Sequence, residues 1–323
     1  MPPAVSVVVP VLDERDSLPG LLAEIAEVAE GIEGGVEIVV VDDGSTDGTD
    51  RVLVEQTQLI PGLKVIRLRR NVGKSVALRI GWTHTTGAAV VTMDGDGQDD
   101  PHEIPTLLAR LNEGYDLVSG WKVERHDPVG KRVASKAFNR VTARVSGVPL
   151  HDMNCGLKAY QGDAVRSLDL YGEQHRFIPV LGDQRGWRIA EIPVNHRARE
   201  HGKSKFGVER FARGLLDLMT VVFLGRYSQR PLHLFGGAGL LSIMLGVLIC
   251  AYLTVLKIGG ESIGRRPLLI FGVLLIVVGV QLLTLGLVGE MIAATRQAIR
   301  GPRSGEEMVA AVIERSPETS DQL

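Results

Sequence analysis

The stretch that decides the fold is Val90-Val91-Thr92-Met93-Asp94-Gly95-Asp96-Gly97-Gln98, in which an apolar run ends abruptly in carboxylates. Alternate residues of a strand share a face, so a strand that reaches this point places Asp94 and Asp96 together. Neighbouring carboxylates repel each other, and a divalent cation with oxygen ligands removes that repulsion. The pattern therefore predicts a metal site for a phosphorylated substrate, with a solvated acidic turn as the alternative. An EF-hand loop is excluded, because its sixth and twelfth positions would be Asp99 and Pro105.

Other apolar runs precede this one, and helical patterns separate them. The predicted strands are Ser6–Val11, Val36–Val41, Leu63–Leu68 and Ala88–Thr92, and the predicted helices include Ser17–Ile32, with Ser17 as N-cap, and Ser75–Thr83. Strands that alternate with helices and are apolar almost throughout predict an α/β fold with a parallel sheet covered on both faces. Polar residues follow three of these strands, at the edge of the sheet where such folds bind ligands.

The composition excludes several classes of protein. The chain has 323 residues, a net charge of −2 and two cysteines. This length suits a catalytic domain with an accessory part, and the balanced charge gives no indication of nucleic-acid binding. Cys155 and Cys250 form no CxxC pair, which argues against a zinc site or a disulfide framework. No basic region followed by a long apolar stretch opens the sequence, so we expect no cleaved signal peptide.

The composition changes after the predicted catalytic domain, residues 1–205. Residues 206–230 mix arginines with large apolar side chains. This mixture predicts amphipathic interfacial helices at a membrane surface, with an ordinary core helix as the alternative.

The segment 231–290 has the pattern of a transmembrane hairpin. Residues 232–256 and 268–289 carry no charge, and each stretch exceeds the roughly 20 residues that cross a bilayer. Two spans leave both ends of the hairpin on one side, and the flanking arginines favour the cytoplasmic side. The remaining residues, 291–323, predict a polar cytoplasmic tail with a short helix around residues 306–314.

Three motifs resemble the nucleotide-sugar half of glycosyltransferase family 2: Val8-Val9-Pro10-Val11-Leu12-Asp13-Glu14, Val40-Val41-Asp42-Asp43-Gly44-Ser45-Thr46 and Asp94-Gly95-Asp96-Gly97-Gln98. Later motifs resemble its polyprenyl-phosphate branch, which includes dolichol-phosphate mannose synthases and bacterial undecaprenyl-phosphate sugar transferases. The resemblance covers about residues 5–290 and implies a Rossmann-like GT-A fold. It also implies a nucleotide-diphosphate sugar donor, a polyprenyl phosphate acceptor, and Mg²⁺ or Mn²⁺ as cofactor.

The resemblance also implies a donor site. Its nucleotide-sugar-binding residues would be Pro10, Asp13, Glu14, Asp42, Asp43, Lys74, Asp94, Gly95 and Asp96. Family members often carry Asn at the position of Asp13. Either Asp42 or Asp43 would bind the base or ribose, with an Asx-turn cap as the alternative role. The metal ligands would be Asp94, Asp96 and Gln98. Lys74 would contact phosphate, or else it simply begins a helix.

A cationic stretch from Lys122 to Lys136 predicts a landing site for the lipid phosphate, with a solvated face as the alternative. Its candidate ligands are Arg125, Lys131, Arg132 and Lys136. The motif His151–Lys158 resembles the acceptor side of the family, where Asp152 would be a catalytic or orienting carboxylate. Cys155, in the same motif, is interpreted as a packing residue rather than a nucleophile.

Two further segments resemble this branch. Arg199, Ser204 and Lys205 match its Arg-x-x-Gly-x-Ser-Lys pattern and would bind the diphosphate or the acceptor phosphate, or else anionic lipid headgroups. The segment Glu173–Pro179 would lie near the donor sugar or the acceptor, without an assigned role.

Together these features predict a membrane-bound, metal-dependent, inverting glycosyltransferase that moves one sugar to polyprenyl phosphate. In this prediction Asp94, Asp96 and the metal neutralise charge on the leaving nucleotide diphosphate. Two alternatives are a transferase that uses another lipid or glycan acceptor, and a catalytically silent membrane scaffold that binds nucleotide sugar. Self-association through the membrane helices is a further hypothesis. A processive polymerase is disfavoured, because Gln184-Arg185-Gly186-Trp187 does not match the Gln-x-x-Arg-Trp signature.

Overall fold

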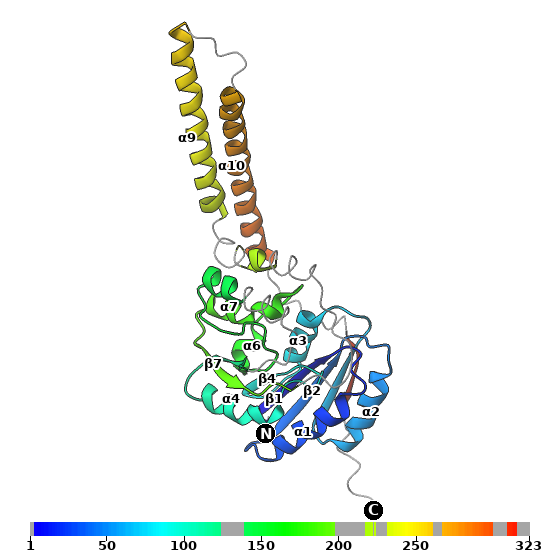
Figure 1. Ribbon diagram of the computed structural model, residues 1–323. Coiled ribbons are helices and arrows are strands. Elements are labelled where there is room, and N and C mark those ends of the chain that lie inside the picture. Colours follow the sequence, from blue (N-terminus) through cyan, green and yellow to red (C-terminus); the bar gives the residue numbers. More distant parts are fainter. Residues whose placement is uncertain are drawn as a thin grey trace, which may run out of the picture. The chain divides into compact units, whose positions relative to one another are not determined.

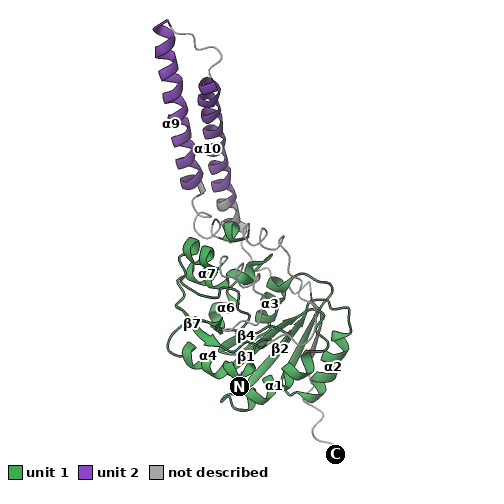
Figure 2. Ribbon diagram, viewed as in Figure 1, with its two compact units in different colours: residues 1–221, 303–323 green, residues 222–302 purple. Residues whose placement is uncertain are grey.

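The computed structural model describes residues 3–123, 139–197, 217–221, 223, 231–260, 267–299 and 309–314. The chain divides into two units, which Figure 2 distinguishes by colour. Unit 1 comprises residues 1–221 and 303–323, and unit 2 comprises residues 222–302. The chain therefore leaves unit 1 once and returns to it near the C-terminus.

Unit 1 is built on an eight-stranded sheet with the order β7-β5-β6-β4-β1-β2-β3-β8. The strands are β1 Val5–Val11, β2 Val36–Asp42, β3 Leu63–Leu68, β4 Ala89–Thr92, β5 Leu117–Lys122, β6 Lys158–Gln161, β7 Ile189–Val194 and β8 Val309–Glu314. The four central strands β4, β1, β2 and β3 are parallel, as their apolar runs predict. The sheet as a whole is mixed, because β6 runs antiparallel to β4 and β5, and β8 runs antiparallel to β3.

Helices cover both faces of this sheet, as Figure 1 shows. They are α1 Leu18–Glu30, α2 Thr49–Leu59, α3 Lys74–Thr83, α4 Ile104–Leu111, α6 Gly162–Arg166 and α7 Ile178–Asp183, with short 3-10 turns η1 Pro101–Glu103 and η2 Gln174–Phe177. The side chains of β1 alternate between two cores: Val7 and Val9 pack with residues of α1, α2 and α4, and Val8 packs with residues of α3 and α7. This alternation buries both faces of the central strands.

Ser17 is the N-cap residue of α1, as predicted, although its side chain makes no capping hydrogen bond. Its hydroxyl instead donates to the Gly95 carbonyl at 2.8 Å, which ties the start of α1 to the acidic turn after β4. The tail contains the strand β8 where a short helix was expected, because the apolar, partly β-branched residues 309–314 pair with the otherwise open edge of β3.

Unit 2 contains two long helices, α9 Pro231–Ile258 and α10 Pro267–Ile299. The segments Leu232–Ile258 and Pro267–Ile292 are long and apolar enough to cross a membrane. Only 17% and 11% of their most apolar windows are buried within the protein, which differs from the core helix of a soluble domain. These helices are therefore candidate membrane spans, in agreement with the predicted hairpin.

The two helices approach each other closely at glycines. A Cβ on Gly239 would lie 2.7 Å from the carbonyl oxygen of Gly279, and a Cβ on Gly279 would lie 2.6 Å from that of Gly239. Beside this contact, the Ser242 hydroxyl donates to the Leu275 carbonyl at 2.8 Å. Small residues let helix backbones meet in this way, so the packing of the hairpin depends on them.

We expect Gly239→Val to loosen this hairpin, since the added side chain forces the two backbones apart. The midpoint of thermal aggregation in detergent should fall by about 2–6 °C. The matched control is Gly237→Val in the same helix, because a Cβ there meets no atom within 4 Å. Equal midpoints for the two variants would contradict the glycine contact.

Candidate active site

The acidic residues lie on a turn at the carboxyl end of β4 rather than on the strand itself. β4 ends at Thr92, so the prediction that strand alternation places Asp94 and Asp96 on one face is wrong. The turn is held by its own polar groups. Asp99 Oδ2 accepts from the Asp94 amide at 3.1 Å, and Asp96 Oδ1 accepts from the Gln98 amide at 3.2 Å.

The donor motifs meet at this turn. A Cβ on Gly95 would lie 2.6 Å from Val11 Cγ1 and 3.4 Å from the Pro10 carbonyl oxygen, so glycine lets the turn pack against the end of β1. The first motif is joined to the second by Asp13, whose Oδ1 accepts from the Thr46 amide at 2.8 Å. The fold thus brings together three motifs that lie far apart in the sequence.

The backbone conformation of Asp13 explains why this position carries Asp here and Asn in many family members. Its φ is +55°, which is the left-handed region that Asn and Asp tolerate better than other residues with a side chain. Its amide donates to Ser45 Oγ at 2.9 Å, and the neighbouring Glu14 amide donates to Thr49 Oγ1 at 3.2 Å. The Asn-to-Asp departure from the family pattern therefore preserves the shape of this loop.

Both carboxylates of the Asp-Asp pair hold turns. Asp42 is fully buried, and its Oδ1 accepts from the Ser45 amide at 2.9 Å. Asp43 accepts from the amides of Val72, at 2.7 Å, and Gly73, at 2.9 Å, directly before α3. Burial raises the pKa of Asp43 in spite of these bonds, and the charge of Asp42 adds to the increase. Because Asp43 occupies these two amides, the loop before α3 does not offer them to a phosphate.

Lys74 begins α3, and its ammonium group contacts Asp94 Oδ1. Partial burial acts to raise the pKa of Asp94, but the Lys74 and Lys122 charges outweigh it and hold that pKa well below its ordinary value. Lys122, at the end of β5, also lies 2.7 Å from the buried Asp99 Oδ1. Asp94 is therefore ionised at neutral pH and faces cations from two sides.

A narrow pocket of about 10 Å³ lies beside Asp94 and is partly open to solvent. It is lined by Lys74, Leu78, Thr92, Met93, Asp94, Asn154, Cys155, Gly156, Lys158, Tyr160, His175 and Ile178. Lys158 is only 2% exposed, and its ammonium donates to the Cys155 carbonyl. Burial lowers the pKa of Lys158, an effect that the nearby Cys155 and Asp152 oppose. The pocket thus combines two ammonium groups, one carboxylate and an apolar wall.

Asp152 is held near this pocket by β7. Its amide donates to Glu191 Oε1 at 2.8 Å, and the His151 amide donates to the same carboxylate at 3.0 Å. Asp152 itself is 1% exposed. The described residues that line the pocket include its neighbours Asn154 and Gly156 but not Asp152. Its predicted role as a catalytic or orienting carboxylate stays a prediction.

Comparisons with known proteins agree with this architecture. Residues 6–169 match the family model "Glycosyl transferase family 2". The chain belongs to glycosyltransferase family 2. It is 40% identical over 90% of its length to dodecaprenyl-phosphate galacturonate synthase of Rhizobium johnstonii, covering 88% of that protein. It is 34% identical over 98% of its length to undecaprenyl-phosphate 4-deoxy-4-formamido-L-arabinose transferase of Klebsiella pneumoniae, covering 96% of that protein.

Solved structures support the GT-A-like fold of this glycosyltransferase. Glucosyl-3-phosphoglycerate synthase from Mycobacterium tuberculosis, solved with Mn²⁺, UDP-glucose and phosphoglyceric acid, aligns with a TM-score of 0.54 at 21% identity. The alignment covers 69% of this chain and 79% of that chain. The UDP complex of the same enzyme aligns with a TM-score of 0.53 at 23% identity, over 69% of this chain and 80% of that chain. At this identity the likeness concerns the fold.

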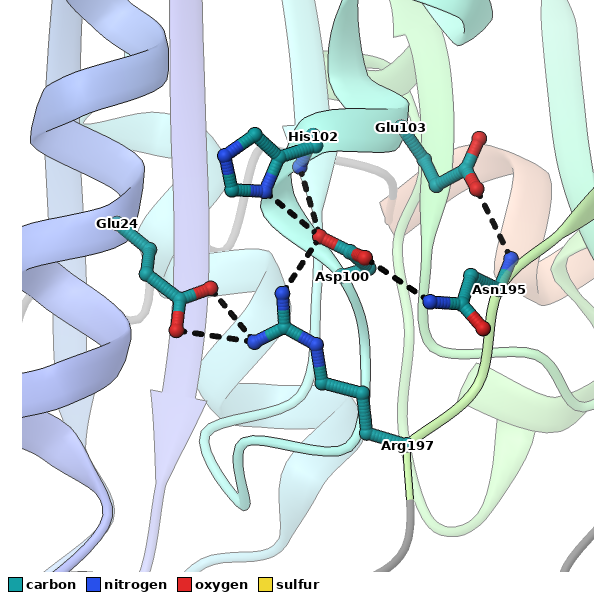
Figure 3. Close-up of polar contacts among 6 residues, drawn as sticks. All are labelled: Glu24, Asp100, His102, Glu103, Asn195 and Arg197. Carbon is teal, nitrogen blue, oxygen red and sulfur yellow. Dashed lines mark hydrogen bonds and ion pairs between the residues drawn. The ribbon is translucent and has the colours of Figure 1, made fainter.

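A second acidic cluster in this glycosyltransferase is an ion-pair network (Figure 3). Side-chain ligand atoms of Glu24, Asp100 and His102 lie within 4.8 Å of one another. Arg197 donates to both Glu24 oxygens, at 2.7 and 2.9 Å, and to Asp100 Oδ1 at 2.9 Å, as the dashed lines show. His102 contacts the same Asp100 oxygen. Arg197 therefore forms ion pairs with both Glu24 and Asp100 in this structure.

Seven predicted site residues of this glycosyltransferase lie outside the described residues. They are Arg125, Lys131, Arg132 and Lys136 of the acceptor-phosphate set, and Arg199, Ser204 and Lys205 of the later motif. Their roles stay predictions. Most of the predicted interfacial segment 206–230 lies outside the description as well.

Lys158 and His175 lie in segments that resemble the family but carried no predicted role of their own, and Tyr160 was not predicted as a site residue. A lysine at the start of the buried strand β6 was the available signal for Lys158, because a charged side chain is seldom buried without a role. Tyr160 packs edge-on against Trp82, with ring centroids 6.0 Å apart, and shows no sequence pattern that separates it from an ordinary core residue.

We expect Cys155→Ser to retain transfer within about threefold, since the thiol packs rather than reacts. Cys155 is 2% exposed, and burial raises the pKa of its thiol to about 12. At pH 8 the folded protein should therefore resist iodoacetamide at Cys155, which peptide mass spectrometry would show. Rapid alkylation at this residue, together with loss of transfer in the serine variant, would identify it as reactive.

Proposed function

We propose that this glycosyltransferase moves a single sugar from a nucleotide-diphosphate sugar to polyprenyl phosphate, with inversion at the anomeric carbon. The observation that carries the proposal is identity of 34–40% over nearly the whole chain to two proteins whose names both contain a polyprenyl phosphate. Those names differ in the sugar. The acceptor class is therefore better supported than the identity of the sugar.

The two apolar helices support a membrane-embedded acceptor. A chain with two candidate spans stays in the bilayer with polyprenyl phosphate, which raises the effective concentration of the acceptor. The residues before and after the hairpin both belong to unit 1. The chain must therefore cross the membrane an even number of times. We place unit 1 on the cytoplasmic side, because Arg226 and Arg230 precede the first span and Arg296, Arg300 and Arg303 follow the second.

The turn after β4 fits a divalent cation. Asp94 and Asp96 offer carboxylate oxygens and Gln98 an amide oxygen, which are the hard ligands that Mg²⁺ and Mn²⁺ prefer. Asp94 is already ionised, because neighbouring cations depress its pKa. A bound cation at this turn would stabilise the charge that develops on the departing nucleotide diphosphate. We propose these three residues as its ligands.

The side chains around the pocket support the transfer itself. Lys74 lies beside Asp94 and is placed to bind a phosphate oxygen of the donor. The acceptor is a phosphate monoester whose second pKa is about 6, so it is a dianion near pH 7 and attacks without a strong base. Asp152, held by Glu191, is proposed to orient groups at the acceptor side. A single displacement of this kind inverts the anomeric configuration.

The test is sugar transfer to a short polyprenyl phosphate in detergent. UDP-galacturonate, UDP-glucose, UDP-N-acetylglucosamine and GDP-mannose would be offered in turn, with Mg²⁺ or Mn²⁺. One labelled, acid-labile lipid product with inverted configuration is the expected result. Donor binding without transfer would favour another acceptor, and absence of donor binding would favour a silent scaffold. A product with retained configuration would exclude the single displacement.

A further inference from the structure

The chain that follows β7 pairs with the acidic turn after β4. Asp99 and His196 form an isolated antiparallel bridge, and the Arg197 amide donates to the Gln98 carbonyl at 2.9 Å. The Gln98 side chain adds a further contact, because its Nε2 donates to the Arg197 carbonyl at 3.3 Å. The backbone of Arg197 therefore holds both the main chain and the side chain of Gln98.

This side-chain contact decides which end of the Gln98 amide is left for a ligand. A carbonyl oxygen accepts hydrogen bonds but cannot donate them, so only the NH₂ end of the amide can face the Arg197 carbonyl. The same nitrogen lies 3.5 Å from His196 Nε2, at the outer limit of a hydrogen bond. Among the described residues, none donates a hydrogen bond to Gln98 Oε1. The oxygen is thus available to a cation, whereas an amide turned the other way would present N–H groups to it.

The Arg197 side chain fastens this segment to two other elements (Figure 3). Its guanidinium donates to both oxygens of Glu24 in α1, at 2.7 and 2.9 Å, and to Asp100 Oδ1 at 2.9 Å. Asn195 donates through its side chain to Asp100 Oδ2 at 3.1 Å and through its backbone to Glu103 Oε1 at 3.0 Å. The Asp100 side chain is only 13% exposed. A network that joins separate elements in this way holds the Arg197 carbonyl in place more firmly than a single surface ion pair would.

We propose that Arg197 is a positioning residue for the cation of the donor site. Its ion pairs with Glu24 and Asp100 fix its own carbonyl, this carbonyl binds the NH₂ end of Gln98, and the amide oxygen of Gln98 is left to bind the cation. Loss of a partner that orients a metal ligand lowers metal affinity by about 10- to 100-fold. The inference rests on the proposed function only in the cation ligands named there; it does not depend on the sugar or the acceptor.

The test measures Mn²⁺ binding to the full chain in detergent, without donor or acceptor, from the electron paramagnetic resonance signal of the free ion. Arg197→Met removes the guanidinium but keeps the backbone groups that contact Gln98. Gln98→Ala and the double variant complete a double-mutant cycle, which separates positioning of Gln98 from a general structural effect. Asp96→Asn is measured beside them and tests the cation site itself.

The matched control is Arg166→Met. The Arg166 guanidinium also joins a carboxylate and a backbone carbonyl, at 2.9 Å from Asp163 Oδ1 and 3.1 Å from the Gly87 oxygen. Its side chain is 28% exposed, against 36% for Arg197. The control therefore removes a comparable set of contacts that does not include Gln98.

We expect Arg197→Met and Gln98→Ala each to weaken Mn²⁺ binding about 10-fold. In the Gln98→Ala background, Arg197→Met should change the affinity by less than about twofold, because no amide is left to position. Arg166→Met should leave the affinity within about twofold of the wild type.

Two results would overturn the proposal while the cation site stands: losses that multiply in the double variant, or unchanged affinity in Arg197→Met, each with binding lost in Asp96→Asn. Weaker binding in Arg166→Met equal to that in Arg197→Met would also overturn it. Full Mn²⁺ binding by Asp96→Asn would instead refute the cation site of the proposed function, and this inference with it.

Discussion

Asp96→Asn is expected to reduce sugar transfer at least about 1,000-fold while the protein remains folded. The substitution replaces a carboxylate oxygen with a neutral amide on the turn that is proposed to hold the cation. Stabilisation of the leaving diphosphate is worth several kcal/mol, and about 4 kcal/mol corresponds to a thousandfold change in rate. Asp94→Asn should have a similar effect, since it removes both a ligand and the partner of Lys74.

The matched control for these variants is Asp169→Asn. Asp169 is 73% exposed and pairs with Arg79 on the surface, so its loss should leave transfer within twofold. Mn²⁺ binding, followed by quenching of tryptophan fluorescence or by calorimetry, should disappear in Asp94→Asn and Asp96→Asn alone. Removal of cations with EDTA should abolish wild-type transfer, and Mg²⁺ or Mn²⁺ should restore it. Full activity of Asp96→Asn would place the metal site elsewhere.

Gly156→Ala is expected to reduce transfer about 100-fold, although the substitution neither adds nor removes a titratable group. A Cβ at this position would lie 2.5 Å from Asp94 Cγ and 2.7 Å from Asp94 Oδ2. Real Cβ atoms essentially never approach other atoms so closely, so the carboxylate must move. A displacement of about 1 Å at a catalytic group is enough for a hundredfold loss.

The control for Gly156→Ala is Gly20→Ala in α1, where a Cβ meets nothing within 4 Å. This change should leave transfer unaltered and raise the free energy of unfolding by about 1 kcal/mol, because alanine favours the helix. Circular dichroism would show that both variants are folded. If Gly156→Ala transfers sugar at the wild-type rate, the observed position of the Asp94 carboxylate is not required for transfer.

The central half of the sheet could be predicted from the sequence because its strands are buried on both faces. β1 to β4 are apolar almost throughout, and their predicted bounds agree with the observed ones to within a residue. β6 is short, and β8 finds its partner β3 far away in the chain, so neither has a comparable local pattern. The antiparallel strands were missed for this reason.

The candidate site likewise contains contacts that have no local sequence pattern. Motif residues such as Asp43 and Asp94 could be named from the sequence, since they follow apolar strands and stand in motifs that resemble those of the family. Their partners could not be predicted. The contact of Lys74 with Asp94 and the contact of His175 with Ser75 each join segments that only the folded sheet brings together.

The edge strand β8 has a consequence for the order in which this protein is made. It is the last strand among the described residues and follows both α9 and α10. During synthesis the edge of β3 stays unpaired until the two apolar helices have left the ribosome, and an open edge invites pairing with other chains. Pairing of β8 with β3 therefore follows synthesis of the hairpin, so this edge of the catalytic sheet is closed only after both apolar helices have been made.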